Sequence, residues 1–207
     1  MLAHIPAFLL TTLLLAIVPG QGVAMVLRQS ILGGKRPALL SVLGSSTGLF
    51  IWGSLSSLGL STIIAKFDIA FFILKWGGVA FLFFLSIQTL LTLKNDFGKF
   101  DLEIAGETKA WSAFRLGLLT QLTNVKAAVF ALSFIPQFVP SDFSLGLGIF
   151  ILGSIWPLVS TSWYILLIWT IDRSAVWIQR AKVRRALTGV SALGIAALAL
   201  GLAFSNN

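Results

Sequence analysis

Residues 17–22, IVPGQG, interrupt a run that is otherwise apolar from Ile5 to Leu27. The run is long enough to cross a hydrocarbon core of about 30 Å at about 1.5 Å per residue. Pro19 lacks the amide hydrogen that would bond to the carbonyl of Leu15, and the two glycines loosen the helix beyond it. Unpaired backbone groups are tolerated in a membrane only where they face protein, water or a ligand. The stretch therefore predicts a broken membrane helix whose break faces inward.

The composition supports this interpretation for the whole chain. Of the 207 residues, 57% are hydrophobic and only 11% are charged, and the mean hydropathy is +0.95. A soluble domain has a lower fraction of hydrophobic residues and a higher fraction of charged residues, so we expect an all-α polytopic membrane protein. There is no cysteine, which excludes disulfides, thiolate nucleophiles and thiolate metal ligands.

Apolar length and breaker residues predict six transmembrane helices within a single membrane domain, 1–207. Because residues 4–27 lack a positive flank and a cleavage site, they are expected to be retained as the first helix rather than removed as a signal peptide. A hydrophilic loop, 94–112, separates two three-helix halves of about 1–93 and 113–207. The predicted helices span residues 4–27, 38–65, 69–93, 113–139, 143–170 and 187–204.

The basic residues predict the orientation. The first, third and fifth connections hold twelve lysines and arginines, whereas the second and fourth hold only Lys66. By the positive-inside rule the odd connections are cytoplasmic and both termini lie outside. The net charge of +8 is explained by these connections, so no nucleic-acid partner is expected. The cluster from Arg180 to Arg185 is interpreted as a topological anchor, with a lipid-headgroup or regulatory role as the alternative.

A short internal repeat supports the division into halves. The segment GLFIWGS at 48–54 recurs as GIFILGS at 148–154, with five of seven residues identical. The predicted topology runs these segments in opposite directions, as in the inverted repeats of many secondary transporters, with the first and fourth helices broken. Chance similarity between Gly-, Ile- and Phe-rich segments is the alternative. Residues assigned to helix packing or gating are Gly44, Gly48, Gly148, Gly153 and Pro136, and packing by small residues needs no transport function.

Residues that could perform chemistry are scarce in the predicted helices. His4 is the only histidine and lies near the chain start, while Asp68, Asp142 and Asp172 lie at helix ends. No carboxylate pair lies on a helix face and no Ser, His and Asp set can be drawn within the helices, while a serine paired with Lys126 is conceivable but has no motif behind it. We therefore expect neither an enzyme nor a metal site nor a cofactor.

Lys126 is the one cation predicted to lie deep in the membrane. If the fourth helix begins near Arg115, Lys126 lies about 16 Å along it, close to the bilayer middle. A charge there costs about 2.5 kcal/mol or more, so it should face protein or water and have a function. Alternatively, residues 111–124 lie along the interface and Lys126 extends to the cytoplasmic side. Lys75, near the outer end of the third helix, is expected to extend outward.

Three segments resemble the lysine-exporter (LysE/RhtB) family of amino-acid exporters. Residues 17–48, IVPGQGVAMVLRQSILGGKRPALLSVLGSSTG, resemble its N-terminal signature, with a Pro-Gly-Pro-like break and a Gly-rich second helix. Residues 114–139, FRLGLLTQLTNVKAAVFALSFIPQFV, resemble its Asn-Pro-Lys motif and Pro-Gln-Phe ending. Residues 73–90 resemble its third helix. In this chain Gln21 and Val125 replace prolines, and Phe81 stands where a tyrosine is frequent, which indicates softer backbone breaks and leaves the substrate subgroup open.

The resemblance implies efflux of amino acids or related small zwitterions across the cytoplasmic (inner) membrane, driven by the proton gradient or the potential. No GxxxxGK[ST] loop for ATP is present. Exchange of one inward proton for one outgoing zwitterion moves one net charge, which at about 150 mV supplies about 3.5 kcal/mol, enough for a gradient of several hundredfold. Lys126, Asp68 and Asp142 stay open as proton carriers, and a homo-oligomer stays open as well.

A deep cation without a neighbouring acid favours a substrate with a carboxylate and no extra positive charge, hence neutral amino acids. The predicted substrate-binding residues are Pro19, Gly20, Gln21, Asn124 and Lys126, with freed carbonyls accepting from the substrate ammonium. A proline kink that only shapes the helix bundle is the alternative for 19–22. Other functions also stay open: an ion exporter of the same superfamily, which would want acids or histidines in its helices, and a non-transporting assembly or lipid-handling protein.

Overall fold

The computed structural model describes residues 4–18, 20–60 and 109–178, with short stretches at 69, 72–73, 76–77, 79–80, 83–84, 87, 91, 189, 193, 196–197, 200 and 203–204. Every secondary-structure element within these residues is helical, so the predicted all-α class is confirmed. The elements are α1 (Ile5–Ile17), α2 (Gln21–Arg28), η2 (Gln29–Gly33), α3 (Lys35–Leu55), η3 (Ser56–Leu60), α6 (Ala110–Leu122), α7 (Val125–Val129), η4 (Phe130–Phe134), η5 (Ile135–Phe138) and α8 (Leu145–Ile178).

Two helices are long and apolar enough to cross a membrane unaided, Lys35–Gly59 and Leu145–Thr170. Two more candidates are bent pairs, Ile5–Ile17 with Gln21–Ile31 at 58° and Ala110–Leu122 with Val125–Phe138 at 55°. These four correspond to the predicted first, second, fourth and fifth membrane helices. The first and fourth are broken, as predicted. The predicted third and sixth helices, with Lys66, Asp68, Lys75, Phe81 and the basic cluster at 180–185, fall largely or wholly outside the described residues.

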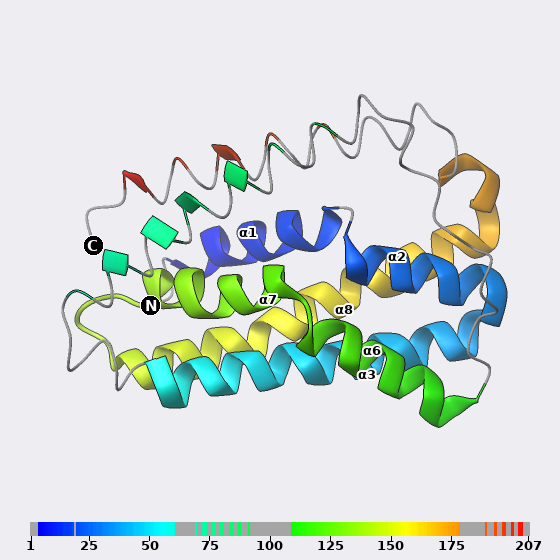
Figure 1. The fold of residues 1–207 in the computed structure, drawn as a ribbon, viewed down its shortest axis with the longest axis horizontal. Coiled ribbons are helices and arrows are strands. Elements are labelled where there is room, and N and C mark those ends of the chain that lie inside the picture. The colour runs from blue at the N-terminus through cyan, green and yellow to red at the C-terminus, as the bar shows by residue number, and fades with distance from the viewer. Residues whose placement is uncertain are drawn as a thin grey trace.

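Helices α3 and α8 run antiparallel and lie side by side (Figure 1). Ser57 Oγ donates to the carbonyl oxygen of Gly146 at 2.7 Å near one end of the pair, and the hydroxyls of Ser46 and Thr161 bond nearer the other. Between these contacts Gly53 meets Gly153, so closely that a Cβ on either residue would lie 2.8 Å from the Cα of the other. The repeated heptapeptides therefore cross at equivalent glycines, the geometry of an inverted repeat.

Helix α6 packs along α3 through small residues. A side chain at Gly44 would meet the backbone of Phe114 and Leu118, and one at Gly117 would meet the carbonyl of Ser41. Such close backbone approach is what small residues allow in membrane helix pairs. Residues 110–122 thus form a half-helix that packs along α3.

Several predicted boundaries differ from the structure by a few residues, and two of these differences have a clear physical reason. Helix α3 begins at Lys35 rather than residue 38, because Gly34 adopts a φ of 83° just before it and Pro37 lies in the first turn, where a missing N–H is tolerated. Helix α8 runs to Ile178 rather than residue 170. Charged residues such as Asp172 and Arg173 are no obstacle to a helix that continues beyond the hydrocarbon, so the polar residues do not mark its end.

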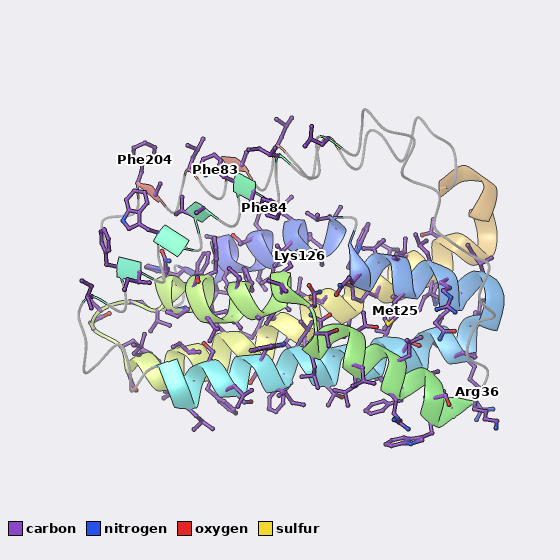
Figure 2. The ribbon with its side chains drawn as sticks, viewed as in Figure 1. Met25, Arg36, Phe83, Phe84, Lys126 and Phe204 are labelled. Atoms are coloured by element: carbon purple, nitrogen blue, oxygen red, sulfur yellow. The ribbon has the colours of Figure 1, made fainter. Side chains whose placement is uncertain are left out.

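The positive side chains of the described residues gather toward one end of the molecule, called the basic end below, where Figure 2 labels Arg36. That end carries the turn between η2 and α3, and the start of α6. Asp142 lies in the turn before α8, at the opposite end. The residues that define the basic end are Arg28, Lys35, Arg36, Lys109 and Arg115.

Candidate transport site

The break between α1 and α2 leaves one backbone carbonyl without its helical donor. Val18 N–H still donates to the carbonyl of Leu14 at 3.2 Å, but residue 19 is proline and has no hydrogen to offer Leu15. Helix α2 begins at Gln21, directly after Gly20, which has an extended backbone. The Gly20 carbonyl accepts from Ala24 N–H at 2.9 Å. Pro19 itself lies outside the described residues.

The break between α6 and α7 is built by an amide cap. The side chain of Asn124 accepts from the backbone N–H of Lys126 at 3.1 Å, and its carbonyl accepts from Ala128 N–H at 3.1 Å. Asparagine is among the best residues for this N-cap role. The bend therefore forms with Val125 in the position where the family signature has proline.

Lys126 joins the two breaks. Its Nζ donates to the carbonyl oxygen of Leu15 at 3.0 Å, the acceptor that Pro19 leaves without a helical partner. A Cβ on Gly20 would lie 3.6 Å from the same Nζ. The side chain therefore points across the protein to the other broken helix, and not along its own helix to the basic end (Figure 2).

A small cavity of about 20 Å³ lies at this junction. It is large enough for one water molecule and far too small for an amino acid, so the structure shows the junction closed. Polar groups nevertheless converge there in an apolar surround, the usual character of a small-molecule site. The lining residues are Leu15, Ala16, Leu49, Gln121, Asn124, Lys126, Ala127, Trp156, Ser160 and Tyr164.

Several of these residues were missed by sequence reasoning. Gln121 is buried; its Oε1 accepts from Ser45 Oγ at 3.2 Å and its backbone carbonyl accepts from Trp52 Nε1 at 3.2 Å. Tyr164 packs so closely on Gly22 that a Cβ there would overlap the phenol oxygen. Tyr164 is the only tyrosine in the chain and Gln121 lies just before the Asn-Val-Lys motif, and these two signals could have drawn attention to them.

The structure brings together Gly20, Asn124 and Lys126 but not Gln21. The Gln21 side chain is exposed and lines a separate groove between α2 and α6. Among the described residues, no group of three or more His, Cys, Asp or Glu side chains is arranged to hold a metal ion.

The glycines predicted for helix packing or gating all lie at close helix contacts. Gly44 and Gly48 face α6, where a Cβ at Gly48 would lie 2.8 Å from the Cβ of Gln121, and Gly153 faces Gly53. Gly148 faces the side chain of Val139. Pro136 is buried in the first turn of η5.

Antiparallel packed helices, two broken membrane spans and a cation bonded at their junction define a polytopic membrane protein of the transporter type. The LysE type translocator family model matches residues 13–206, and the chain belongs to that family. The predicted family resemblance is thus confirmed.

Individual relatives agree with this assignment. The chain is 28% identical to the uncharacterized membrane protein YrhP of Bacillus subtilis (strain 168), over 94% of this chain and 95% of that protein. It is 30% identical to an uncharacterized membrane protein of Pseudomonas aeruginosa, PA4757, over 94% and 90%. It is 38% identical to the homoserine/homoserine lactone efflux protein of Salmonella typhi, over 64% of this chain and 63% of that protein. No solved structure matches the chain.

Proposed function

We propose that the protein is a secondary transporter that exports neutral amino acids from the cytoplasm across the inner membrane, with its basic end toward the cytoplasm. The observation that carries the proposal is the bond between Lys126 Nζ and the Leu15 carbonyl oxygen, 3.0 Å long. It pairs a cationic donor with a backbone acceptor that lacks a helical donor. A zwitterion offers the complementary pair, a carboxylate and an ammonium.

In the proposed binding step the substrate inserts between these two groups. Its carboxylate accepts from Lys126 Nζ, a charge-assisted bond, and its ammonium donates to the Leu15 carbonyl in place of the lysine. Asn124, which lines the same cavity, positions Lys126 by capping α7. Because the cavity holds only about 20 Å³, the broken helices must separate when the substrate enters.

The name of the Salmonella relative supports the substrate class. Homoserine is a neutral amino acid with both a carboxylate and an ammonium, whereas its lactone has lost the free carboxylate. The described cavity lining contains no acidic residue, so a second positive charge on the substrate would find no partner. We therefore propose homoserine-like zwitterions as better substrates than the lactone, lysine or arginine. We propose the proton gradient or the membrane potential as the driving force.

The test is export of radiolabelled homoserine from cells or vesicles that carry the full-length protein. Lys126→Met should lower export at least tenfold, because the substrate carboxylate loses its cationic donor and the Leu15 carbonyl loses its partner. Lys109→Met removes an exposed lysine at the basic end and should export normally. Both variants should insert in the membrane at equal levels. Undiminished homoserine export by Lys126→Met would refute the role of this residue.

A further inference from the structure

A second cavity lies between α2 and α6, on the basic-end side of the two breaks. It is an open groove of about 360 Å³, a size typical of small-molecule sites. Figure 2 labels Met25 between the two helices that form it. The lining residues are Gln21, Ala24, Met25, Arg28, Leu116, Thr120 and Thr123.

The groove and the closed junction are adjacent along both broken spans. Gln21 lines the groove and follows Gly20, which faces Lys126 Nζ. Thr123 lines the groove and precedes Asn124, which lines the inner cavity. The two breaks alone therefore separate the groove from the junction at which Lys126 meets Leu15.

The corresponding place in the other half of the repeat is filled. There the second part of the other broken span, α7 to η5, packs on α1. Phe8 is fully buried, with ring centroids 6.2 Å from Phe130 and 5.4 Å from Phe138. Of these two equivalent interfaces, the one at the basic end carries the groove, whereas the described residues of the other include these packed aromatic rings.

The chemistry of the groove suits a small amino acid. Arg28 makes an interaction within the protein, and a guanidinium has five N–H donors that can serve more than one acceptor. Gln21, Thr120 and Thr123 add amide and hydroxyl groups, whereas Met25 and Leu116 form an apolar wall. Among the described residues that line the groove none is acidic, so these residues offer no partner to a second cation on the ligand.

We infer that this groove is a separate loading site, where a neutral amino acid binds from the basic end before it passes between the breaks to Lys126. The inference rests on the proposed function but is independent of Lys126 itself. The carboxylate is held by the groove's donors, and the side chain of the substrate lies on the apolar wall.

The natural absence of cysteine allows a direct test with single-cysteine variants in inside-out vesicles. Thr120→Cys places a thiol in the groove, and Leu119→Cys places one on the exposed, neighbouring position of α6 outside it. A membrane-impermeant, charged thiol reagent should label Cys at 120. Homoserine should slow that labelling at least fivefold, whereas it should leave the rate at 119 unchanged.

Adding Lys126→Met to the Thr120→Cys variant separates the two sites. Protection by homoserine should persist in this double variant even though export is lost. Loss of protection would show that the ligand acts only through the inner junction, and would overturn a separate loading site. If export of every amino acid fails in the parent protein while protection persists, the proposed function falls and the binding site stands.

A lipid headgroup carries anionic groups too, so the vesicle composition must be varied. Protection should be equal in vesicles of phosphatidylcholine alone and in vesicles with one third phosphatidylglycerol. Labelling that responds to phosphatidylglycerol and not to homoserine would overturn the inference in favour of a lipid site. Absence of any labelling at 120 would also overturn it, since the groove would then be closed to water.

As a kinetic check, Thr120→Trp should fill the groove and raise the KM for homoserine at least tenfold, with a smaller change in the maximal rate. Leu119→Trp is the matched control and should leave both unchanged. A fall in maximal rate with an unaltered KM in Thr120→Trp would contradict binding in the groove.

Discussion

At the scale of single residues, Asn124 and Lys126 act as one unit. The Asn124 side chain accepts from the backbone of Lys126 and thereby fixes the first turn of α7, from which the lysine reaches Leu15. A cap that starts a helix in the middle of a membrane also satisfies a backbone donor that water cannot reach. The position of the ammonium therefore depends on a neutral amide two residues earlier.

Replacing Asn124 by Ala should destabilise the protein by about 1 kcal/mol, the usual value of an N-cap, and displace Lys126. We expect a melting temperature lower by about 2–4 °C in detergent, together with weaker homoserine export. Asn124→Ser keeps a capping oxygen and should retain most of both properties. Equal melting and export in the Ala variant and the parent would contradict a capping role.

At the scale of elements, the crossing of α3 and α8 depends on Gly53 and Gly153, whose backbones are in direct contact. Pro157 lies four residues after Gly153 in the same helix and has no N–H to donate to the Gly153 carbonyl. That carbonyl faces Gly53, where an added Cβ would lie 2.9 Å from its oxygen. Phe50 and Phe150 flank the crossing with ring centroids 6.1 Å apart. The crossing is thus made by equivalent residues of the two repeats.

A large side chain at this crossing should force the helices apart. Gly153→Leu places its Cβ 2.8 Å from the Cα of Gly53, and backbone cannot give way as a flexible side chain would. Overpacking of this kind costs about 1–3 kcal/mol or more, so the folded yield and melting temperature should fall. Gly59→Leu is the control, since a Cβ at Gly59 meets nothing within 4 Å. Equal melting of the two variants would show that the crossing tolerates separation.

At the scale of the whole molecule, the separation of charge predicts how the protein sits in the membrane. Lys35 and Arg36 lie exposed in the first turn of α3, and Lys109 lies exposed before α6, all at the basic end. Asp142 is exposed in the turn before α8, at the other end. The positive-inside rule then directs the groove toward the cytoplasm, the side from which an exporter must collect its substrate.

Single cysteines at positions 35 and 142 should test this orientation. Lys35→Cys should react with an impermeant thiol reagent only in inside-out vesicles, and Asp142→Cys only in intact cells or right-side-out vesicles. Both side chains are exposed, so accessibility is not limited by packing. The reverse pattern would turn the groove outward and remove its role in loading.

The sequence predicted features that depend on local chemistry. The breaks follow from Pro19, Gly20 and Asn124, and the inward direction of the half-buried Lys126 side chain follows from the rule that a deep cation should face protein or water. The bond from Lys126 to Leu15 joins residues 111 positions apart, and no local pattern specifies such a pair. For the same reason sequence reasoning placed Gln21 at the inner site, because a helix period alone does not say that α2 turns this side chain toward α6.

A carrier that works by net efflux must return empty after each release. The conversion between its two orientations is fast only if the empty site contains no unpaired buried group. Under the proposed binding step Lys126 supplies that condition, because without substrate its ammonium donates to the Leu15 carbonyl oxygen. In this sense the Lys126 ammonium replaces the substrate ammonium as the donor to the Leu15 carbonyl oxygen. A carrier of this kind needs no second amino acid for its return, so we expect net discharge of the cytoplasmic pool rather than one-for-one exchange of amino acids.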